Sequence, residues 1–582
     1  MGSEAYLGVE RSLGGRRWVG PDATRQRLTE ALAQETGLSE ALCGVLSARG
    51  VRAPDVTGYL APTLRDLMPD PLRLRDMEAA TTRLIEAATR GERIAIFADY
   101  DVDGAASAAL LIDWLRDLGC APSLYVPDRM LEGYGPNPAA MRQLADAHDL
   151  IICVDCGTMA HDAIAAAEEC DVVVIDHHLG AETLPPALAI VNPNRQDESG
   201  DLGHLCAAAV VFLVLVHANR RLREEGRTGP DLMGALDLVA LATVADVAPL
   251  TGVNRAIVAT GLKIMSQRGR PGLAALADIG RLKSKPAAYH LGFVLGPRIN
   301  AGGRVGRADL GARCLSTRDP HEAQALAERL DAFNTDRREI EAGVRDAALA
   351  QIEARGMPGA LAWAAGEGWH PGVVGIAAAR LKEATRRPAV VIGFDGDLGH
   401  GSGRSVTGVD LGHAVQKLVA EGLLEKGGGH RMAAGLTVRR DRLDAAMARL
   451  EELLARQGAG AGDGDALRLD GVLMPGAATL ELVEQLEAAG PYGQASPAPR
   501  FVLPDVMVLH ARRVGTGHLK VTLGDGLGAR LDAISFGAFD GPIGPAVEGH
   551  GGRRFHVAGH LEMNDWQGRM TVQMRIDDVA EA

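Results

Sequence analysis

Three aspartates stand at alternate positions directly after a short apolar run. Residues 93–98 (RIAIFA) have the composition of a buried strand, and Asp99, Asp101 and Asp103 follow it. If the chain stays extended here, side chains two residues apart point to the same side. Three carboxylates on one side repel each other, and cations among them remove that cost. The spacing predicts a cation site, followed by a helix that starts near Ala105.

Two further apolar runs end in side chains that can bind a metal ion. These are residues 150–154 (LIICV) before Asp155, and residues 172–175 (VVVI) before Asp176, His177 and His178. In open parallel sheets, ligand sites form outside the carboxyl ends of the strands. A further acid, Asp246, lies in an apolar helical stretch, where a carboxylate needs a partner. We therefore expect all of these side chains to meet in one cleft.

The types of ligand in this set indicate the metal. Carboxylates with one or two histidines favour Mn²⁺ and Mg²⁺ over Zn²⁺. The set is large enough for two ions, which about 3.5–4 Å apart clamp the attacking and leaving oxygens of a phosphoryl displacement. A single aspartate in a loop is usually only solvated, but that interpretation does not explain the whole set.

Composition limits the class of protein. The chain has 582 residues, 47% of them hydrophobic, and a formal net charge of −14, which argues against coating nucleic acid by bulk charge. Seven irregularly spaced cysteines are typical of a reduced cytoplasm. Cys153 and Cys156 form a lone C-x-x-C, either a redox pair or, as we favour, two small packed residues. The longest apolar run, residues 206–216, is too short to cross a membrane.

The elements that must position the cation site fall into five zones. Short runs alternating with helices predict a parallel sheet with helices on both faces, then a strut-like helix, a second α/β domain, a Gly-rich linker and a β-rich barrel or sandwich. The expected limits are residues 1–75 (lead-in), 76–317 (catalytic), 318–357 (long helix), 358–457 (second α/β domain) and 466–582 (β-rich domain).

Four runs resemble the motifs of the DHH phosphoesterase superfamily: 98–104 (ADYDVDG), 154–157 (VDCG), 176–178 (DHH) and 243–246 (TVAD). Four others are similar to the RecJ family of bacterial single-strand-specific exonucleases: 296–304 (GPRINAGGR), 369–380 (WHPGVVGIAAAR), 401–405 (GSGRS) and 427–435 (GGGHRMAAG). The resemblance implies an α/β fold in which a parallel-sheet DHH domain and a DHHA1 domain are joined by a long helix. An oligonucleotide-binding (OB-like) β-barrel would follow.

The resemblance also implies a role for each residue of the cation site. One Mn²⁺ would be held by Asp99, Asp101 and Asp155, and a second by Asp103, Asp155, His177 and Asp246, with Mg²⁺ as an alternative ion. His178 would lie near the scissile phosphate, and Asp176 would orient a histidine. Asp155, Asp176 and His178 are therefore the expected catalytic residues.

A second set of residues is expected to contact phosphate or DNA. Arg298 and Arg304 fall in a predicted Gly-rich loop, Ser402 and Arg404 in a predicted short turn, and Gly428, Gly429 and His430 in another predicted loop ahead of a helical run. Arg129 either contacts phosphate or is solvated, and Tyr134 either stacks on a base or packs in a core. Lys520 and Trp566 are candidate contacts on the barrel, or ordinary surface. His370 is expected to position or cap rather than bind metal.

These features together predict a 5′→3′ exonuclease for single-stranded DNA that releases 5′-mononucleotides by a two-metal mechanism. Its expected setting is DNA repair and recombination in the cytoplasm, as a monomer beside a single-strand-binding protein and a RecQ-type helicase, with no membrane. One alternative is a phosphodiesterase for short oligoribonucleotides or signalling dinucleotides, for which long strands are poor substrates. Another is a non-catalytic scaffold, which would have lost metal-site residues that this chain keeps.

Overall fold

The computed structural model describes residues 4–129, 132–356, 359–460, 466–566 and 569–582. The first α/β domain is built on a parallel five-stranded sheet of order β3-β2-β4-β5-β6. Its strands are β2 (Ile94–Ala98), β3 (Ser123–Tyr125), β4 (Leu150–Val154), β5 (Asp171–Ile175) and β6 (Ala189–Val191). All residues of β2 and β4 are buried, as expected for strands covered on both faces.

Helices cover both faces of this sheet. One face packs against α5 (Met77–Arg90), α6 (Val102–Asp117) and α9 (Ala207–Glu224), and the other against α7 (Pro138–Ala147) and α8 (His161–Ala165). Further helices extend the first core: α10 (Leu236–Ala245), α11 (Gly252–Ser266), α12 (Pro271–Ile279), α13 (Ala288–His290), the π-helical η4 (Leu291–Leu295), α14 (Gly296–Val305) and α15 (Leu310–Ser316).

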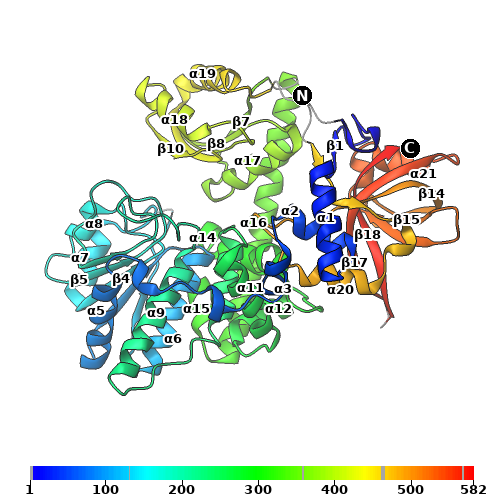
Figure 1. The fold of residues 1–582 in the computed structure, drawn as a ribbon. Helices are drawn as coiled ribbons and strands as arrows, with labels where there is room; N and C mark the ends of the chain where they lie inside the picture. Colours follow the sequence, from blue (N-terminus) through cyan, green and yellow to red (C-terminus); the bar gives the residue numbers. More distant parts are fainter. Residues whose placement is uncertain (1–3, 130–131, 357–358, 461–465, 567–568) are drawn as a thin grey trace.

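One long helix, α16 (Pro320–Arg355), leads from this domain to a second α/β domain (Figure 1). The second sheet has the order β10-β11-β9-β8-β7. Its elements are β7 (Ala362–Glu367), α17 (Pro371–Thr385), β8 (Ala389–Asp395), β9 (Leu398–Arg404), α18 (Leu411–Ala420), β10 (Lys426–His430), β11 (Ala433–Arg439), η5 (Arg440–Arg442) and α19 (Leu443–Arg456). Only β7 and β8 pair in parallel.

The C-terminal domain is a closed five-stranded barrel. Its strands are β14 (Phe501–Val514), β15 (His518–Gly524), β16 (Arg530–Ser535), β17 (Arg554–Trp566) and β18 (Arg569–Glu581), and the β14–β17 pairing closes it. Smaller elements accompany them: β12 (Leu467–Arg468), β13 (Gly471–Val472), η6 (Pro475–Ala477), α20 (Leu480–Ala488), η7 (Ala538–Asp540) and α21 (Ile543–Glu548). The barrel, the parallel sheet and the long helix confirm the predicted fold class.

The N-terminal segment packs on the barrel, a partner that the sequence did not indicate. It contains η1 (Tyr6–Gly8), β1 (Trp18–Val19), α1 (Ala23–Thr36), α2 (Glu40–Ala48), η2 (Ala53–Asp55) and α3 (Val56–Leu60). The elements that follow, α4 (Leu64–Leu67) and η3 (Pro71–Arg73), instead pack on helices α11 and α9 of the first domain. Side chains of α1 and α2 share one hydrophobic core with the barrel strands, and β1 pairs with β12. The fully buried Asp578 of β18 accepts hydrogen bonds from Ser12 Oγ (2.6 Å) and Trp18 Nε1 (3.0 Å). The two ends of the chain therefore form one unit (Figure 1).

Four local predictions were wrong. The acidic segment does not stay extended: α6 begins at Val102, capped by Asp101, whose Oδ1 accepts from the backbone N–H of Asp103 at 2.9 Å. Residues 296–305 form helix α14 rather than a loop. Their glycines allow close packing, because a Cβ on Gly303 would lie 2.3 Å from the ring of Tyr100.

The two other Gly-rich runs, predicted as a turn and a loop, are strands. Residues 401–404 belong to β9, in the middle of the second sheet, and residues 427–430 to β10. A Cβ on Gly401 would lie 2.8 Å from Ile392 and Leu436, and one on Gly403 would lie 2.7 Å from Leu411. Glycine is needed here because the sheet has no space for a side chain on that face. None of the helices in the described ranges combines the length and apolarity needed to cross a membrane.

Candidate metal centre and phosphate pocket

The acidic residues follow the carboxyl ends of three neighbouring strands of the first sheet, and we call this end of the sheet its carboxyl edge. In the parallel register Ala98 pairs with Val154 and Val154 with Ile175, so Asp99, Asp155 and Asp176 follow directly at the same edge. Asp155 adopts a φ of 59°, a left-handed conformation that is uncommon for a residue other than glycine. Such a conformation is held by its surroundings and is typical of functional sites.

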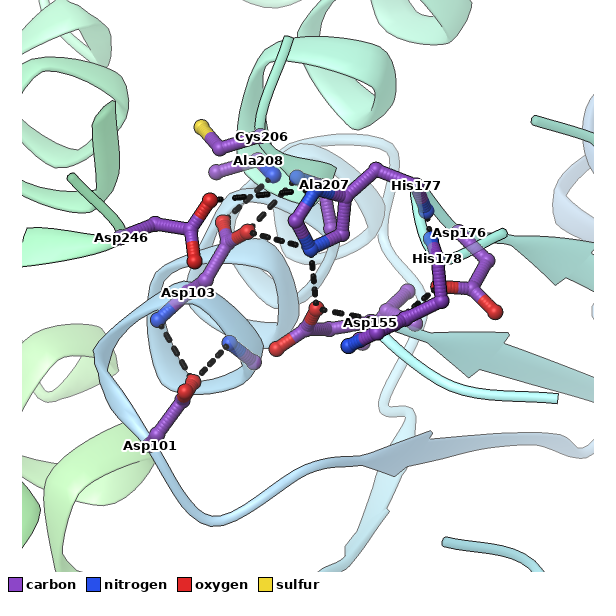
Figure 2. A network of polar contacts seen from close by, with 12 residues as sticks. Asp101, Asp103, Asp155, Asp176, His177, His178, Cys206, Ala207, Ala208 and Asp246 are labelled. Atoms are coloured by element: carbon purple, nitrogen blue, oxygen red, sulfur yellow. Dashed lines mark hydrogen bonds and ion pairs between the residues drawn. The ribbon is translucent and has the colours of Figure 1, made fainter. Parts of the chain in front are cut away.

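Six side chains converge at this edge, and we call them the acid cluster: Asp99, Asp101, Asp103, Asp155, His177 and Asp246. Within it, ligand atoms of Asp99, Asp101 and Asp155 lie within 4.8 Å of one another, as do those of Asp103, His177 and Asp246. A third such group consists of Asp155, His177 and His178. Figure 2 shows the side chains of Asp103, Asp155, His177 and Asp246 pointing toward one another from α6, the ends of the strands and the end of α10.

His177 lies between the carboxylates of the acid cluster. Its Nε2 is 3.3 Å from Asp155 Oδ1 and 3.8 Å from Asp103 Oδ2, and its Nδ1 is 3.8 Å from Asp246 Oδ2 (Figure 2). Asp103 is held from behind by the start of α9, where the N–H groups of Ala207 and Ala208 donate to its two oxygens at 2.7 and 2.8 Å. The helix terminus thus fixes this carboxylate in place.

Burial and repulsion make the cluster unstable when its carboxylates are charged. Asp99, Asp103 and Asp155 are at most 2% exposed. Burial, reinforced by neighbouring aspartates, raises the pKa of Asp99 to about 7, that of Asp246 to about 8, and that of Asp155 well above its usual value. Among the described residues, Oδ1 of Asp99 and Oδ1 of Asp155 accept no hydrogen bond although both are buried. Orphaned carboxylate oxygens with one imidazole are a donor set that fits Mn²⁺ or Mg²⁺.

Asp176 orients His178 instead of joining the acid cluster. Its Oδ1 accepts from His178 Nδ1 at 2.8 Å and from the backbone N–H groups of His177 and His178 at 2.7 and 3.1 Å. Burial opposes a charge on His178, but the hydrogen bond and charge of Asp176 outweigh burial and raise its pKa to about 9. His178 Nε2 faces the other way, 3.2 Å from the hydroxyl of the exposed Tyr134. The hydrogen bond to Asp176 therefore fixes the orientation of the ring and directs Nε2 toward Tyr134.

A second group of like charges lies between the two α/β domains, and we call Arg129, Arg304 and Arg404 the arginine cluster. The Arg129 guanidinium lies 5.3 Å above the Tyr100 ring. Arg304 donates to the carbonyl of Gly372 at 3.0 Å, and Arg404 donates to Ser402 Oγ at 3.0 Å. In the part of the chain that the structure describes, none of the three forms an ion pair with a carboxylate.

Mutual repulsion and burial make the arginine cluster a candidate site for an anion. Burial lowers the pKa of Arg304, and Arg129 lowers it further; burial and Arg304 lower the pKa of Arg404. The start of α17 also faces the cluster: a Cβ on Gly375 would lie 3.1 Å from a guanidinium nitrogen of Arg404. Helix N-termini and unpaired arginines both favour phosphate. As predicted, His370 caps this helix, its Nδ1 accepting from Gly372 N–H at 3.0 Å.

Other predicted contacts lie elsewhere. Arg298, unlike the three arginines of the cluster, has a carboxylate partner: its Nε is paired with Asp331 of α16 at 2.8 Å. Gly428, Gly429 and His430 lie on the edge strand β10, and His430 is exposed. Lys520 is on the barrel, 3.9 Å from Asp532 Oδ2. The side chain of Trp566 lies outside the described residues.

Two supporting residues were missed. Tyr100 lies between Asp99 and Asp101 in the acidic run, and its ring contacts Arg129, so this residue links the two clusters. Asn300 accepts from the N–H of Val102 at 2.9 Å and anchors the start of α6. The sequence signal was present in both cases, because each lies within a motif that had been singled out for its other residues.

The chain matches three family models: "DHH family, N-terminal domain" over residues 93–243, "DHHA1 domain" over 357–456 and "RecJ OB domain" over 469–578. Two relatives are named single-stranded-DNA-specific exonuclease RecJ. The one from Escherichia coli K12 is 36% identical, covering 95% of this chain and 98% of its own. The one from Dickeya dadantii is 38% identical, covering 93% and 97%.

Solved structures give a similar result. RecJ from Thermus thermophilus in complex with Mn²⁺ superposes with a TM-score of 0.79 at 29% identity, over 97% of this chain and 79% of that one. The same protein in complex with Mg²⁺ gives 0.73 at 28% identity, over 97% and 78%.

Proposed function

The chain belongs to the RecJ family, and from this premise we propose that it is a metal-dependent exonuclease that degrades single-stranded DNA from the 5′ end and releases 5′-mononucleotides. One observation carries the proposal. An acid cluster suited to two cations and an arginine cluster suited to a phosphate adjoin at Tyr100, which lies between Asp99 and Asp101 in the chain and whose ring contacts Arg129. A terminal phosphate bound by the arginines would bring the first phosphodiester bond toward the acids.

The residues of the acid cluster would divide between two ions. Asp99, Asp101 and Asp155 would hold one, and Asp103, Asp155, His177 and Asp246 the other, so that Asp155 bridges. When bound, Mn²⁺ or Mg²⁺ supplies a Lewis acid and lowers the pKa of the attacking water. His178, oriented by Asp176, would in its protonated form donate from Nε2 to a non-bridging oxygen of the scissile phosphate.

The arginine cluster would set the end from which the strand is degraded. Arg129, Arg304 and Arg404, with the hydroxyl of Ser402, would bind a 5′-terminal phosphate at the start of α17. Because these groups come from both α/β domains, the pocket requires the domain arrangement that α16 maintains. Tyr134, exposed beside His178, would stack on a base near the scissile bond.

The barrel would retain the rest of the strand, with Lys520 and Trp566 as proposed contacts. A supply of single strands requires unwinding, so we propose a RecQ-type helicase and a single-strand-binding protein as partners of a monomeric enzyme in DNA repair and recombination. Seven cysteines, none in a disulfide, support a reducing compartment such as the cytoplasm. The domain limits proposed are residues 1–75, 76–317, 318–357, 358–457 and 466–582.

Degradation of a long single strand with Mn²⁺, labelled in one sample at the 5′ end and in another at the 3′ end, tests this function. The expected result is immediate release of labelled mononucleotide from the 5′ end, with gradual shortening of the 3′-labelled strand. Release from the 3′ end first would contradict the polarity. Survival of long strands while dinucleotides are cleaved would favour a small-substrate phosphodiesterase.

A further inference from the structure

Two aromatic rings stack on each other in solvent, outside both clusters. Tyr289 is 60% exposed and Phe293 is 69% exposed, with ring centroids 5.0 Å apart and planes at 23°. Exposing a stacked pair of large apolar rings to water is unfavourable, and a molecule that covers the pair removes this cost. The pair is therefore a candidate for binding another molecule.

The backbone beneath the rings is firmly anchored. Tyr289 lies on α13 and Phe293 on the π-helical η4, while Leu291 and Leu295 of the same turn are fully buried. The π-helical turn is itself a geometry found frequently at functional sites. Buried leucines on one side and exposed rings on the other show that the rings are presented on a rigid support.

This support packs against the helix that carries part of the acid cluster. A Cβ on Gly292 would lie 3.5 Å from Cγ1 of Val244, and one on Gly296 would lie 3.6 Å from Cβ of Ala245. Asp246 follows these two residues of α10 directly. The rings therefore stand on an element that borders the metal centre.

Three basic residues precede the rings: Arg281, Lys283 and Lys285. None of them forms an ion pair among the described residues, and all three are exposed. Their segment lies against the support, because a Cβ on Gly280 would be 2.7 Å from Cγ1 of Val294. We call these five residues the basic-aromatic strip.

The strip extends toward the C-terminal barrel domain. Burial raises the pKa of Glu487 on α20, and the charge of Lys285 opposes that rise, so the two residues are close in space. Nearby, the N–H of Leu250 donates to the carbonyl of Gln494 at 2.8 Å, joining the first domain to the segment that leads into the barrel. The strip thus lies between the metal centre and the barrel.

We propose that the basic-aromatic strip binds single-stranded DNA on the 3′ side of the cleavage site, between the metal centre and the barrel. This inference rests on the proposed function and adds a binding site to it. Exposed rings offer a face on which any base stacks, and exposed cations attract the phosphates; together they form a general single-strand site. A chain with a net charge of −14 that places three exposed cations beside two exposed rings is suited there to a polyanion with aromatic bases.

The test uses the full-length protein and two single strands. One strand has about four nucleotides, and the other about 30, which is longer than the roughly 4–16 nucleotides that one OB barrel covers. The double variant Tyr289→Ala/Phe293→Ala removes both rings. Two controls accompany it: Tyr289→Phe/Phe293→Tyr, which keeps two stacking faces, and Leu28→Ala, which shortens an exposed apolar side chain on α1.

The double alanine variant should bind the long strand about tenfold more weakly without metal, and its ratio of kcat/KM on the long strand to that on the short one should fall by a similar factor. Both controls should match the wild type. A double variant that binds and degrades the long strand normally overturns the proposal, and the rings would then serve a protein partner. Equal loss on both strands also overturns it, because the change would then act on the metal centre. A wild type that degrades neither strand would instead disprove the proposed function.

Discussion

The acid cluster and the arginine cluster share one physical feature, a concentration of like charge, which is negative in the first and positive in the second. Each gathers like charges with too few partners of opposite charge, so each would be stabilised by a ligand: cations in one, a phosphate in the other. They differ in origin. The acid cluster comes from adjacent strands and helices of one domain, whereas the arginine cluster takes Arg129 and Arg304 from the first domain and Arg404 from the second.

That difference separates a preformed site from an assembled one. The carboxylates of the acid cluster are fixed by a parallel register and by the start of α9, within a single buried core. The arginine cluster depends on the contact of Arg304 with Gly372 across the domain boundary. Metal binding should therefore survive changes that disturb the domain boundary, and end recognition should not.

The change with the largest expected effect is Asp155→Asn. It removes the carboxylate proposed to bridge two ions, so turnover should fall by about 10³-fold or more. The metal-free protein should unfold at an equal or higher temperature, because a neutral amide replaces a buried carboxyl group that is repelled whenever it ionises. Steady-state degradation and thermal unfolding measure the two effects. Asp162→Asn, an exposed change on α8, is the control, and an active Asp155→Asn enzyme would refute the bridging role.

Arg404→Gln tests the assembled site. A charge-assisted hydrogen bond to a buried phosphate contributes about 1.5–3 kcal/mol, so the preference for a 5′-phosphate over a 5′-hydroxyl end should fall by about 10- to 150-fold. Mn²⁺ binding, followed by calorimetry, should be unchanged. Lys417→Gln is the control, because it also removes a positive charge but lies on the exposed face of α18. Equal loss of activity on both kinds of end would show a general backbone contact instead.

The acid cluster should make stability depend on pH only when metal is absent. The folded-state pKa values of Asp99 and Asp246 are about 7 and 8, whereas an aspartate in an unfolded chain ionises near pH 4. Between these values the folded state holds protons that the unfolded chain has released, so the free energy of unfolding falls as pH rises.

Thermal unfolding at pH 6 and pH 8, with and without Mn²⁺, measures this effect. We expect the metal-free midpoint to fall by about 2–4 °C for each kcal/mol lost, and the stabilisation by Mn²⁺ to be larger at pH 8. In the Asp155→Asn variant, the midpoint of thermal unfolding without metal should depend less on pH than in the wild type. Stabilisation by Mn²⁺ that does not change with pH would show that the carboxylates are ionised without the metal.

The smallest expected effect is that of Ser402→Ala. One hydroxyl contributes about 0.5–1.5 kcal/mol, so the preference for a 5′-phosphate should fall by about two- to tenfold, less than in Arg404→Gln. The ratio of kcat/KM on phosphorylated and hydroxyl ends measures it. Ser405→Ala is unsuitable as a control because that side chain is buried; Ser266→Ala on α11, far along the chain, is preferable. If Ser402→Ala reduced the preference for a 5′-phosphate more than Arg404→Gln does, Ser402 and not Arg404 would be the main contact to that phosphate.

The acid cluster could be predicted from the sequence because most of its residues directly follow short apolar strands. Asp99, Asp155 and the residues after Ile175 each follow a short buried strand, and parallel pairing brings strand ends together without further information. The arginine cluster could be predicted only as a list of residues. Glycines around Arg304 and Arg404 were interpreted as loop and turn signals, but they serve close packing in α14 and β9, which only the tertiary neighbours reveal.

Packing between distant parts of the chain was likewise beyond the sequence. Nothing local in residues 12–18 indicates that they bond to Asp578. Asp101 and Asp103 were expected in an extended segment, yet they begin α6, because Asn300 and the capping carboxylate of Asp101 favour the helix. The ligand types were still predicted, since a helix start and an extended strand both bring these side chains to the end of β2.

The most direct test of the two-cluster account is a crystal of the full-length protein containing Mn²⁺ and a short 5′-phosphorylated strand, with anomalous scattering used to locate manganese. The account predicts two manganese peaks within the acid cluster, joined by Asp155, and the terminal phosphate among the three arginines. A single peak, a peak away from the acid cluster, or a terminal phosphate outside the arginine cluster would contradict it.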